Sequence, residues 1–493
     1  MDMNTHLRHN SGGFSGYQQL PQEAASEDPH DPLASSLVLE DEAGDFVAQE
    51  EAAAHDPRVR YIHFILGCAV LLPWNALITA SPYFLSRLEG SPIKSTFNSY
   101  LSTTFTVANF GFLAHATISS KLSSSARRAM ASLAILTFLA LTLTINTWIH
   151  APPGLFFAFV MLNGIAQAGA GSYLQTAIIA VASLFGPSAV QSMMSGQAAV
   201  GVAVSGVQVI STLASTRGKG SPSSLAASSP EESSAFTFFL LSTLFLIFSA
   251  VAQSWLVKLP AYACLMDQYK HINAVSQGGV DADEHSGLVS PSRTHSQASD
   301  RKEQIIRVTK ANAIYNLAVA YVFAVTLAVF PPITISVAPV NPRTSGLVFS
   351  AIHFFVFNVG DFCGRFICSY PRFLIWSAKR LLGFSLARTL FIPLFLLCNV
   401  QRSAGNASTP LINSDIVFML ILFFFGMSNG YGCSMCMIAA PSVEHNPRLR
   451  GRVEDVDTAA TVGSFFLVGG LAVGSFASFG VRAAICDCNP FRS

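Results

Sequence analysis

Apolar residues along the chain recur in long unbroken stretches rather than in the alternating pattern of a surface strand. Eleven stretches follow residue 57, each of roughly 20 residues and so long enough to cross a bilayer as a helix. They lie near 61–81, 97–119, 128–148, 155–181, 190–213, 235–257, 311–336, 345–370, 381–400, 415–440 and 458–480. The pattern therefore predicts an all-α membrane protein with eleven transmembrane helices.

Polar segments divide this pattern into parts. Residues 1–57 are polar and acidic and lack the basic start and apolar core of a signal peptide, so they predict a disordered tail. Segment 258–310 is rich in Ser, Gln, Asp, His and Gly and predicts a mobile loop. These breaks predict a six-helix bundle over 58–257, a five-helix bundle over 311–482 and a short tail at 483–493.

The positions of Lys and Arg predict the orientation, because cytoplasmic loops are enriched in both residues. With a cytoplasmic amino terminus, the cytoplasmic segments hold 18 of them and the extracytoplasmic segments hold 8. An odd number of spans then places the carboxyl terminus, and the loop with the sequon at Asn406, outside the cytoplasm. That sequon is either glycosylated or a chance match. The membrane is either the plasma membrane or a vacuolar or other internal membrane.

Composition agrees with a bilayer protein and excludes several functions. Only 12% of the residues are charged, whereas about 25% is usual in soluble domains. The net charge of +1 gives no reason to expect a nucleic-acid partner. The chain has no phosphate-binding glycine loop, no metalloprotease motif and no nucleophile elbow. We therefore expect neither an enzyme nor an ATP-driven pump, and neither a cofactor nor a metal.

The eighth stretch carries polar residues where a bilayer disfavours them. Asn358, Asp361 and Arg365 stand at i, i+3 and i+7, which places all three on one helix face. Ionisable groups at this depth usually face a bundle interior or a wet cavity. The pair either locks this helix to its neighbours or forms a polar ligand site, with Arg365 donating and Asp361 accepting. Arg388, in the ninth stretch, either reaches toward the membrane surface or bonds backbone carbonyls.

Two further stretches carry polar faces. The fourth has polar or small residues at every fourth position, namely Asn163, Gln167, Gly171 and Gln175. The fifth repeats the pattern with Gln197, Gly201, Ser205 and Gln208. Carboxamides donate and accept hydrogen bonds, which suits a neutral substrate with hydroxyls or a heterocycle. The alternative is helix packing through small and polar residues, which we favour for Gly201 and Ser205.

The first stretch contains Pro73, which removes a backbone hydrogen bond and kinks a helix. In a membrane such a kink is tolerated where a neighbour or a cavity satisfies the freed groups. Trp74 beside it is suited to stacking on a flat ring. A tryptophan of the membrane interface is the alternative.

Four of these segments together resemble one known family. Leu71-Leu-Pro-Trp-Asn75, Met194-Ser-Gly-Gln197, Phe357-Asn-Val-Gly-Asp-Phe-Cys-Gly-Arg365 and Ser428-Asn-Gly-Tyr431 are similar, in this order, to motifs of the equilibrative nucleoside transporters. The resemblance runs from about residue 60 to 482. Gly432 stands where the family usually has Leu, and the tail with Cys486 and Cys488 is longer than usual.

The resemblance implies a fold, an activity and a set of substrate-binding residues. The fold is major-facilitator-like with six plus five helices, and the activity is carriage of nucleosides, in some members nucleobases, by alternating access. Trp74 is expected near the nucleobase, Gln175 bonded to it, Asp361 and Arg365 on the ribose, and Leu471 on the apolar side. Asn358 completes the candidate set, on the same helix face as the charged pair.

These features predict facilitated diffusion by a monomer in the lipid bilayer. Nucleosides are neutral at pH 7, and an Asp361 paired with Arg365 is a poor proton carrier. Two alternatives remain, a carrier of another polar solute such as a sugar and a membrane receptor that binds its ligand without moving it.

Overall fold

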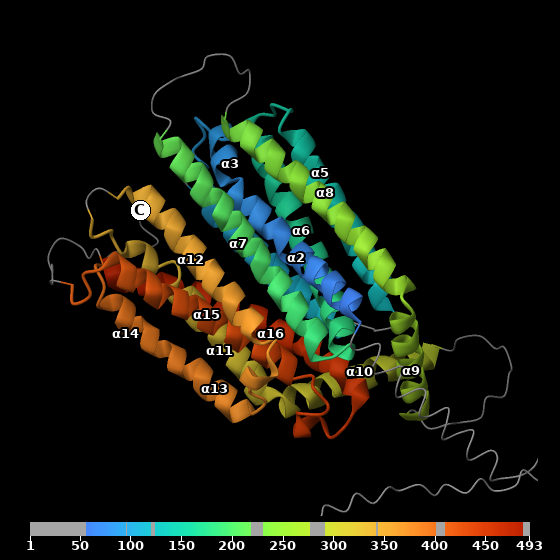
Figure 1. Ribbon diagram of the computed structural model, residues 1–493. Helices are drawn as coiled ribbons and strands as arrows, with labels where there is room; N and C mark the ends of the chain where they lie inside the picture. Colours follow the sequence, from blue (N-terminus) through green and yellow to red (C-terminus); the bar gives the residue numbers. More distant parts are fainter. Residues whose placement is uncertain are drawn as a thin grey trace, which may run out of the picture. The chain divides into compact units, whose positions relative to one another are not determined.

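The computed structural model describes residues 56–94, 96–119, 124–217, 230–276, 291–341, 344–400 and 410–486. The predicted tail up to residue 55, the sequon at Asn406 and Cys488 lie outside them. The described chain is helical (Figure 1). Its first helices are α2 (Pro57–Thr79), α3 (Ser81–Arg87), α4 (Phe97–Ser119), α5 (Ser125–Asn146), α6 (Pro153–Leu184), α7 (Pro187–Arg217) and α8 (Pro230–Lys258). The others are α9 (Pro260–Ser276), α10 (Pro291–Ala311), α11 (Ala313–Val329), α12 (Gly346–Ile367), α13 (Ala378–Ala387), α14 (Phe391–Leu396), α15 (Asp415–Ala439) and α16 (Val456–Cys486).

Nine helices in the described part of the chain are long and apolar enough to cross a membrane. They are α2, α5, α6, α7, α8, α11, α12, α15 and α16. The all-helical membrane fold predicted from the apolar stretches is thus confirmed. Two predicted spans are helical but are not among the nine. One is α4, whose apolar residues are diluted by Ser, Thr and Asn. The other, 381–400, is interrupted.

The interruption of the predicted span 381–400 has a local cause. Helix α13 ends at Ala387, a 3-10 turn follows over Arg388–Leu390, and α14 begins at Phe391. Pro393 has no N–H to donate to the preceding turn, which weakens helical continuity at this point. Arg388 turns its side chain into the protein, where it is 1% exposed.

The segment 258–310 differs from the predicted mobile loop. Its described parts form α9 and α10, and residues 277–290 lie outside the description. Polar composition suggested a loop, but α10 carries an apolar contact at its carboxyl end. Val308 is 1% exposed and packs with Leu449 and Ala459. This contact fixes α10 against the segment before α16 and the start of α16 itself.

Helix packing determines which side chains can meet. Helix α2 lies along α7, α5 lies against α6 and α8, and α4 lies against α6. Among the later helices, α12 pairs with α15 and α11 with α16. Helix α12 also runs beside α7 (Figure 1). Helix α16 lies beside α6 and α4. We name the two ends of this arrangement the Pro57 end and the Thr79 end, after the residues that begin and end α2.

Glycines bring the backbones of α12 and α15 into direct contact. A Cβ atom on Gly364 would overlap the carbonyl oxygen of Met427, and one on Gly430 would overlap that of Asp361. Close backbone approach of this kind stabilises helix pairs in membranes through van der Waals contact. It also places Asn429 of α15 directly against the charged residues of α12.

We predict that Gly430→Ala lowers the stability of the protein because the added methyl group meets fixed backbone rather than a movable side chain. Overpacking of this kind costs at least ~1 kcal/mol. The measurement is the melting temperature and the monodisperse fraction in detergent. Gly111→Ala is the matched control, because nothing lies within 4 Å of the position its Cβ would take. Equal stability of the two variants would contradict the proposed close contact.

Candidate functional site

A cavity of about 600 Å³ lies among α2, α4, α6, α16, Phe354 of α12, the end of α11 and the segment after it. Three aromatic residues line it, namely Trp74, Phe105 and Phe354. Carboxamides and hydroxyls provide its polar groups, from Asn109, Gln167, Gln175, Ser102, Thr106, Ser475 and Ser478. No lining residue that the structure describes carries a charge. A volume of this size fits a small organic ligand, and the lining suits a neutral one.

Helix α2 places Trp74 in the cavity wall beside the proline predicted to kink it. Trp74 stacks on Phe105 of α4, with the ring centroids 4.3 Å apart. Asn75 Nδ2 donates to the Leu71 carbonyl at 2.9 Å, one turn back along the helix. A cavity beside the helix is an environment in which a membrane helix tolerates proline. The indole is therefore held at the wall with a partner on one face.

Gln175 and Leu471 reach the same cavity from α6 and α16. Gln175 is 8% exposed, and its carboxamide has no hydrogen-bond partner among the described residues. Buried carboxamides are normally satisfied, so this group is available to a ligand. Three of the six candidate residues, Trp74, Gln175 and Leu471, thus share one cavity.

The other three candidates lie elsewhere in this conformation. Arg365 Nε donates to Asp361 Oδ2 at 2.9 Å, which is the pair that the i, i+4 spacing allows. Arg365 Nη1 donates to the carbonyl of Met194 on α7 at 3.1 Å. Asn358 Nδ2 donates to the Phe354 carbonyl at 3.0 Å. Asn358 Oδ1 lies 2.7 Å from the position that a Cβ atom on Gly201 of α7 would take. Arg365 and Asn358 therefore lie at the contact between α12 and α7, and Asp361 is tied to that contact through Arg365.

The ion pair continues into a chain of hydrogen bonds that the sequence did not reveal. Asn429 Nδ2 donates to Asp361 Oδ1 at 2.6 Å, and Thr326 Oγ1 donates to Asn429 Oδ1 at 2.7 Å. Arg388 Nη2 donates to Thr326 Oγ1 at 2.9 Å. Asn429 could have been suspected, since it is a carboxamide inside an apolar stretch and part of the Ser428-Asn-Gly-Tyr431 motif. Its partner depends on helix pairing, which spacing within one stretch does not determine.

Arg388 bonds backbone carbonyls, the second of its two predicted roles. Its Nη1 donates to the Val322 carbonyl at 2.5 Å, and its Nε donates to Ser428 Oγ at 3.0 Å. The guanidinium also lies over the Phe425 ring, 4.9 Å from its centroid. These contacts join α11 and α15 to the turn between α13 and α14.

Comparison with known proteins decides the family. The sequence model of a family described as "Nucleoside transporter" matches residues 160–483. This chain belongs to the nucleoside transporter family. The membership confirms the resemblance found in the sequence motifs, and it confirms that the chain is not an enzyme.

Curated relatives of this family align along most of the chain. "Equilibrative nucleoside transporter 1" of Rattus norvegicus is 27% identical, over 88% of this chain and 99% of that protein. "Equilibrative nucleoside transporter 2" of Mus musculus is 29% identical, over 86% and 96%. "Nucleoside transporter FUN26" of Saccharomyces cerevisiae is 24% identical, over 84% and 82%.

Solved structures show the fold of this family member to be of the major-facilitator type. The fucose:proton symporter FucP of E. coli has a TM-score of 0.51 at 16% identity, over 87% of this chain and 94% of that one. FucP in the outward conformation gives 0.50 at 16% identity, over 89% and 94%. At this identity the likeness concerns the fold alone.

We predict that Arg388→Ala destabilises the protein, because it leaves the Val322 carbonyl and Thr326 without their charged donor inside the helices. Losing a buried charged donor costs about 2 kcal/mol or more. Thermal unfolding in detergent measures it. Arg380→Ala, at an exposed site on α13, is the control and leaves the melting temperature unchanged. A tolerated Arg388→Ala would show that the network is dispensable.

Proposed function

We propose that this protein carries nucleosides, and also nucleobases, across a membrane by facilitated diffusion. The observation that carries the proposal is the uncharged cavity, which offers aromatic faces, hydroxyls and the unpartnered carboxamide of Gln175. A nucleoside is a neutral molecule with a flat heterocycle and a polyhydroxylated sugar, so it matches each of these groups. The names of the curated relatives support the same substrate class.

The proposed architecture has eleven spans in two bundles of six and five. The nine apolar helices, together with α4 and the interrupted α13–α14 segment, make the eleven spans. The segment with α9 and α10 connects the bundles. The functional unit is a monomer in the lipid bilayer, and substrate reaches the cavity between the bundles.

The six candidate residues take two roles in this proposal. Trp74 stacks on the nucleobase, Gln175 bonds it, and Leu471 provides apolar contact. Arg365 and Asp361 hold the ribose, with Asn358 beside them, in a conformation where α7 has moved and the bond from Arg365 to the Met194 carbonyl is broken. That carbonyl is a neutral acceptor, as is a ribose hydroxyl, so one can replace the other.

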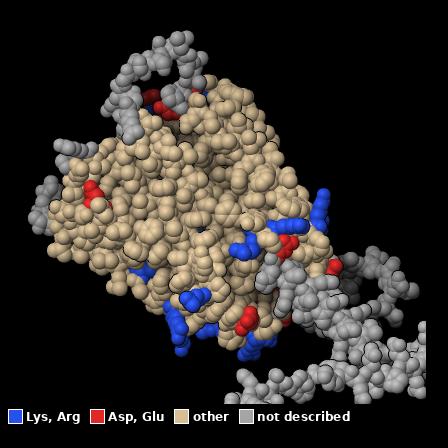
Figure 2. Space-filling view, viewed as in Figure 1, with Lys and Arg blue, Asp and Glu red and all other residues tan. Residues whose placement is uncertain are grey.

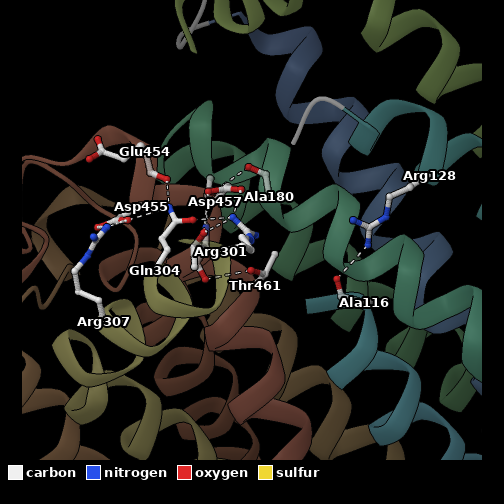
Figure 3. Close-up of polar contacts among 12 residues, drawn as sticks. Ala116, Arg128, Ala180, Arg301, Gln304, Arg307, Glu454, Asp455, Asp457 and Thr461 are labelled. Carbon is white, nitrogen blue, oxygen red and sulfur yellow. Dashed lines mark hydrogen bonds and ion pairs between the residues drawn. The ribbon is translucent and has the colours of Figure 1, made fainter. Parts of the chain in front are cut away.

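The two ends of the protein support alternating access. Ile78, Ser102 and Ser478 line the cavity near the Thr79 end of their helices. At the Pro57 end, Arg307 Nη2 on α10 donates to both oxygens of Asp455, at 2.7 and 3.0 Å (Figure 3). Arg301 Nη1 lies 3.9 Å from Asp457 Oδ2. Access from the Pro57 end requires α10 to separate from these residues at the start of α16 and just before it.

The charge distribution supports a cytoplasmic Pro57 end. Lys and Arg gather at the end where α9 and α10 lie (Figure 2), as expected of the cytoplasmic side. The amino terminus is then cytoplasmic and the carboxyl terminus extracytoplasmic. The membrane is the plasma membrane or an internal one. The alternatives remain a carrier of another polar solute, such as a sugar, and a receptor without flux.

We predict that the purified protein moves radiolabelled adenosine or uridine into proteoliposomes and that Gln175→Ala lowers this uptake at least ~10-fold, because the base loses its hydrogen-bond partner. Gln208→Ala, outside the cavity, is the control. Unlabelled nucleosides compete for uptake, and hexoses do not. Uptake blocked by hexoses would favour a sugar carrier, binding without flux would favour a receptor, and normal uptake by Gln175→Ala would refute the site.

A further inference from the structure

Gln167 lines the same cavity, two turns before Gln175 on α6, and it differs from Gln175 in one respect. The carboxamide of Gln175 has no partner among the described residues, so it can rotate to present either its oxygen or its nitrogen. The carboxamide of Gln167 is held by a chain of hydrogen bonds that begins on α5. The direction of that chain determines which atom of Gln167 faces a ligand.

The first link of the chain fixes Asn163. Its Nδ2 lies 3.1 Å from the Leu139 carbonyl, which only accepts hydrogen bonds. It also lies 3.1 Å from Thr142 Oγ1, whose own proton is donated to the Leu139 carbonyl at 2.7 Å. The amide therefore must turn its nitrogen toward α5 and its oxygen toward Gln167. A reversed amide would set oxygen against oxygen at both contacts.

The second link fixes Gln167. Its Nε2 donates to Asn163 Oδ1 at 2.5 Å. The nitrogen is engaged, and Oε1 has no hydrogen-bond partner in the part of the chain that the structure describes. Gln167 is 3% exposed, so the side chain has little freedom to turn over. The cavity thus contains one acceptor of fixed direction.

We propose that Gln167 Oε1 determines base specificity by accepting a hydrogen bond from an exocyclic amino group of the nucleobase. The inference rests on the proposed function. A base with an amino group, as in adenosine, satisfies this oxygen. A purine with hydrogen at C6 in place of the amino group leaves Gln167 Oε1 unpaired. A purine with a carbonyl there, as in inosine, sets two acceptors against each other. Sites that depend on a fixed buried hydrogen bond discriminate strongly against ligands that lack it.

The test compares three purine nucleosides that differ only around C6. Unlabelled adenosine, purine riboside and inosine compete with labelled adenosine for uptake into proteoliposomes. For the unaltered protein we expect adenosine to inhibit at ~10-fold lower concentration than purine riboside, with inosine no better than purine riboside. In Gln167→Leu, adenosine and purine riboside inhibit at similar concentrations, because neither the hydrogen bond nor the unpaired oxygen remains. Gln208→Leu, the same substitution outside the cavity, keeps the original ratio.

A second variant separates the fixed direction of the amide from its mere presence. In Asn163→Leu, Gln167 keeps its carboxamide but loses the group that orients it, so it can turn its nitrogen toward a carbonyl. We expect inosine to approach adenosine in this variant, whereas Gln167→Leu gives no such gain. Inosine that stays weak in Asn163→Leu would overturn the orienting role.

The outcomes distinguish the inference from the proposed function. If the unaltered protein moves no nucleoside, the proposed function fails. If it moves nucleosides but adenosine and purine riboside inhibit equally, or Gln167→Leu keeps their ratio, only the inference on Gln167 fails. If Gln167→Leu does not fold, Asn163→Leu still tests the role of the amide, and equal inhibition by adenosine and purine riboside on the unaltered protein still overturns the inference.

Discussion

The structure depends on how the buried carboxylate of Asp361 is satisfied. An ionised group among membrane helices is costly unless each of its oxygens has a partner. Arg365, on the same helix, donates a hydrogen bond to one oxygen, and Asn429 of α15 donates to the other. The second bond exists because Gly364 and Gly430 let the two backbones touch. Arg365 then reaches the Met194 carbonyl, so three helices share one charge.

This arrangement keeps the charges out of the cavity. Asp361 and Arg365 are paired with each other, Arg388 bonds the Val322 carbonyl, and the lining residues described are neutral. A neutral ligand therefore needs no counter-ion in order to bind. Facilitated transport also requires moderate affinity in both access states, since tight binding to one state would stop the cycle. The few hydrogen bonds and the one stacked ring of the proposed site would meet that requirement.

The sequence predicted what one helix determines and missed what two helices determine together. The pairing of Asp361 with Arg365 follows from helical spacing, and the stripe that holds Gln167 and Gln175 does too. The separation of the charged pair from the cavity depends on where α7 lies, and the partner role of Asn429 depends on its pairing with α12. Helix α10 was missed because its polar composition outweighed a single buried contact at Val308.

Counterflow tests the central claim most directly, since only a carrier with an alternately accessible site exchanges substrate in this way. Proteoliposomes are loaded with unlabelled adenosine and diluted into a trace of labelled adenosine, with no ion gradient imposed. The account predicts a transient accumulation of label above its external concentration, and none in vesicles loaded with a hexose. Equal label in both kinds of vesicle, or accumulation only when a pH gradient is applied, would contradict it.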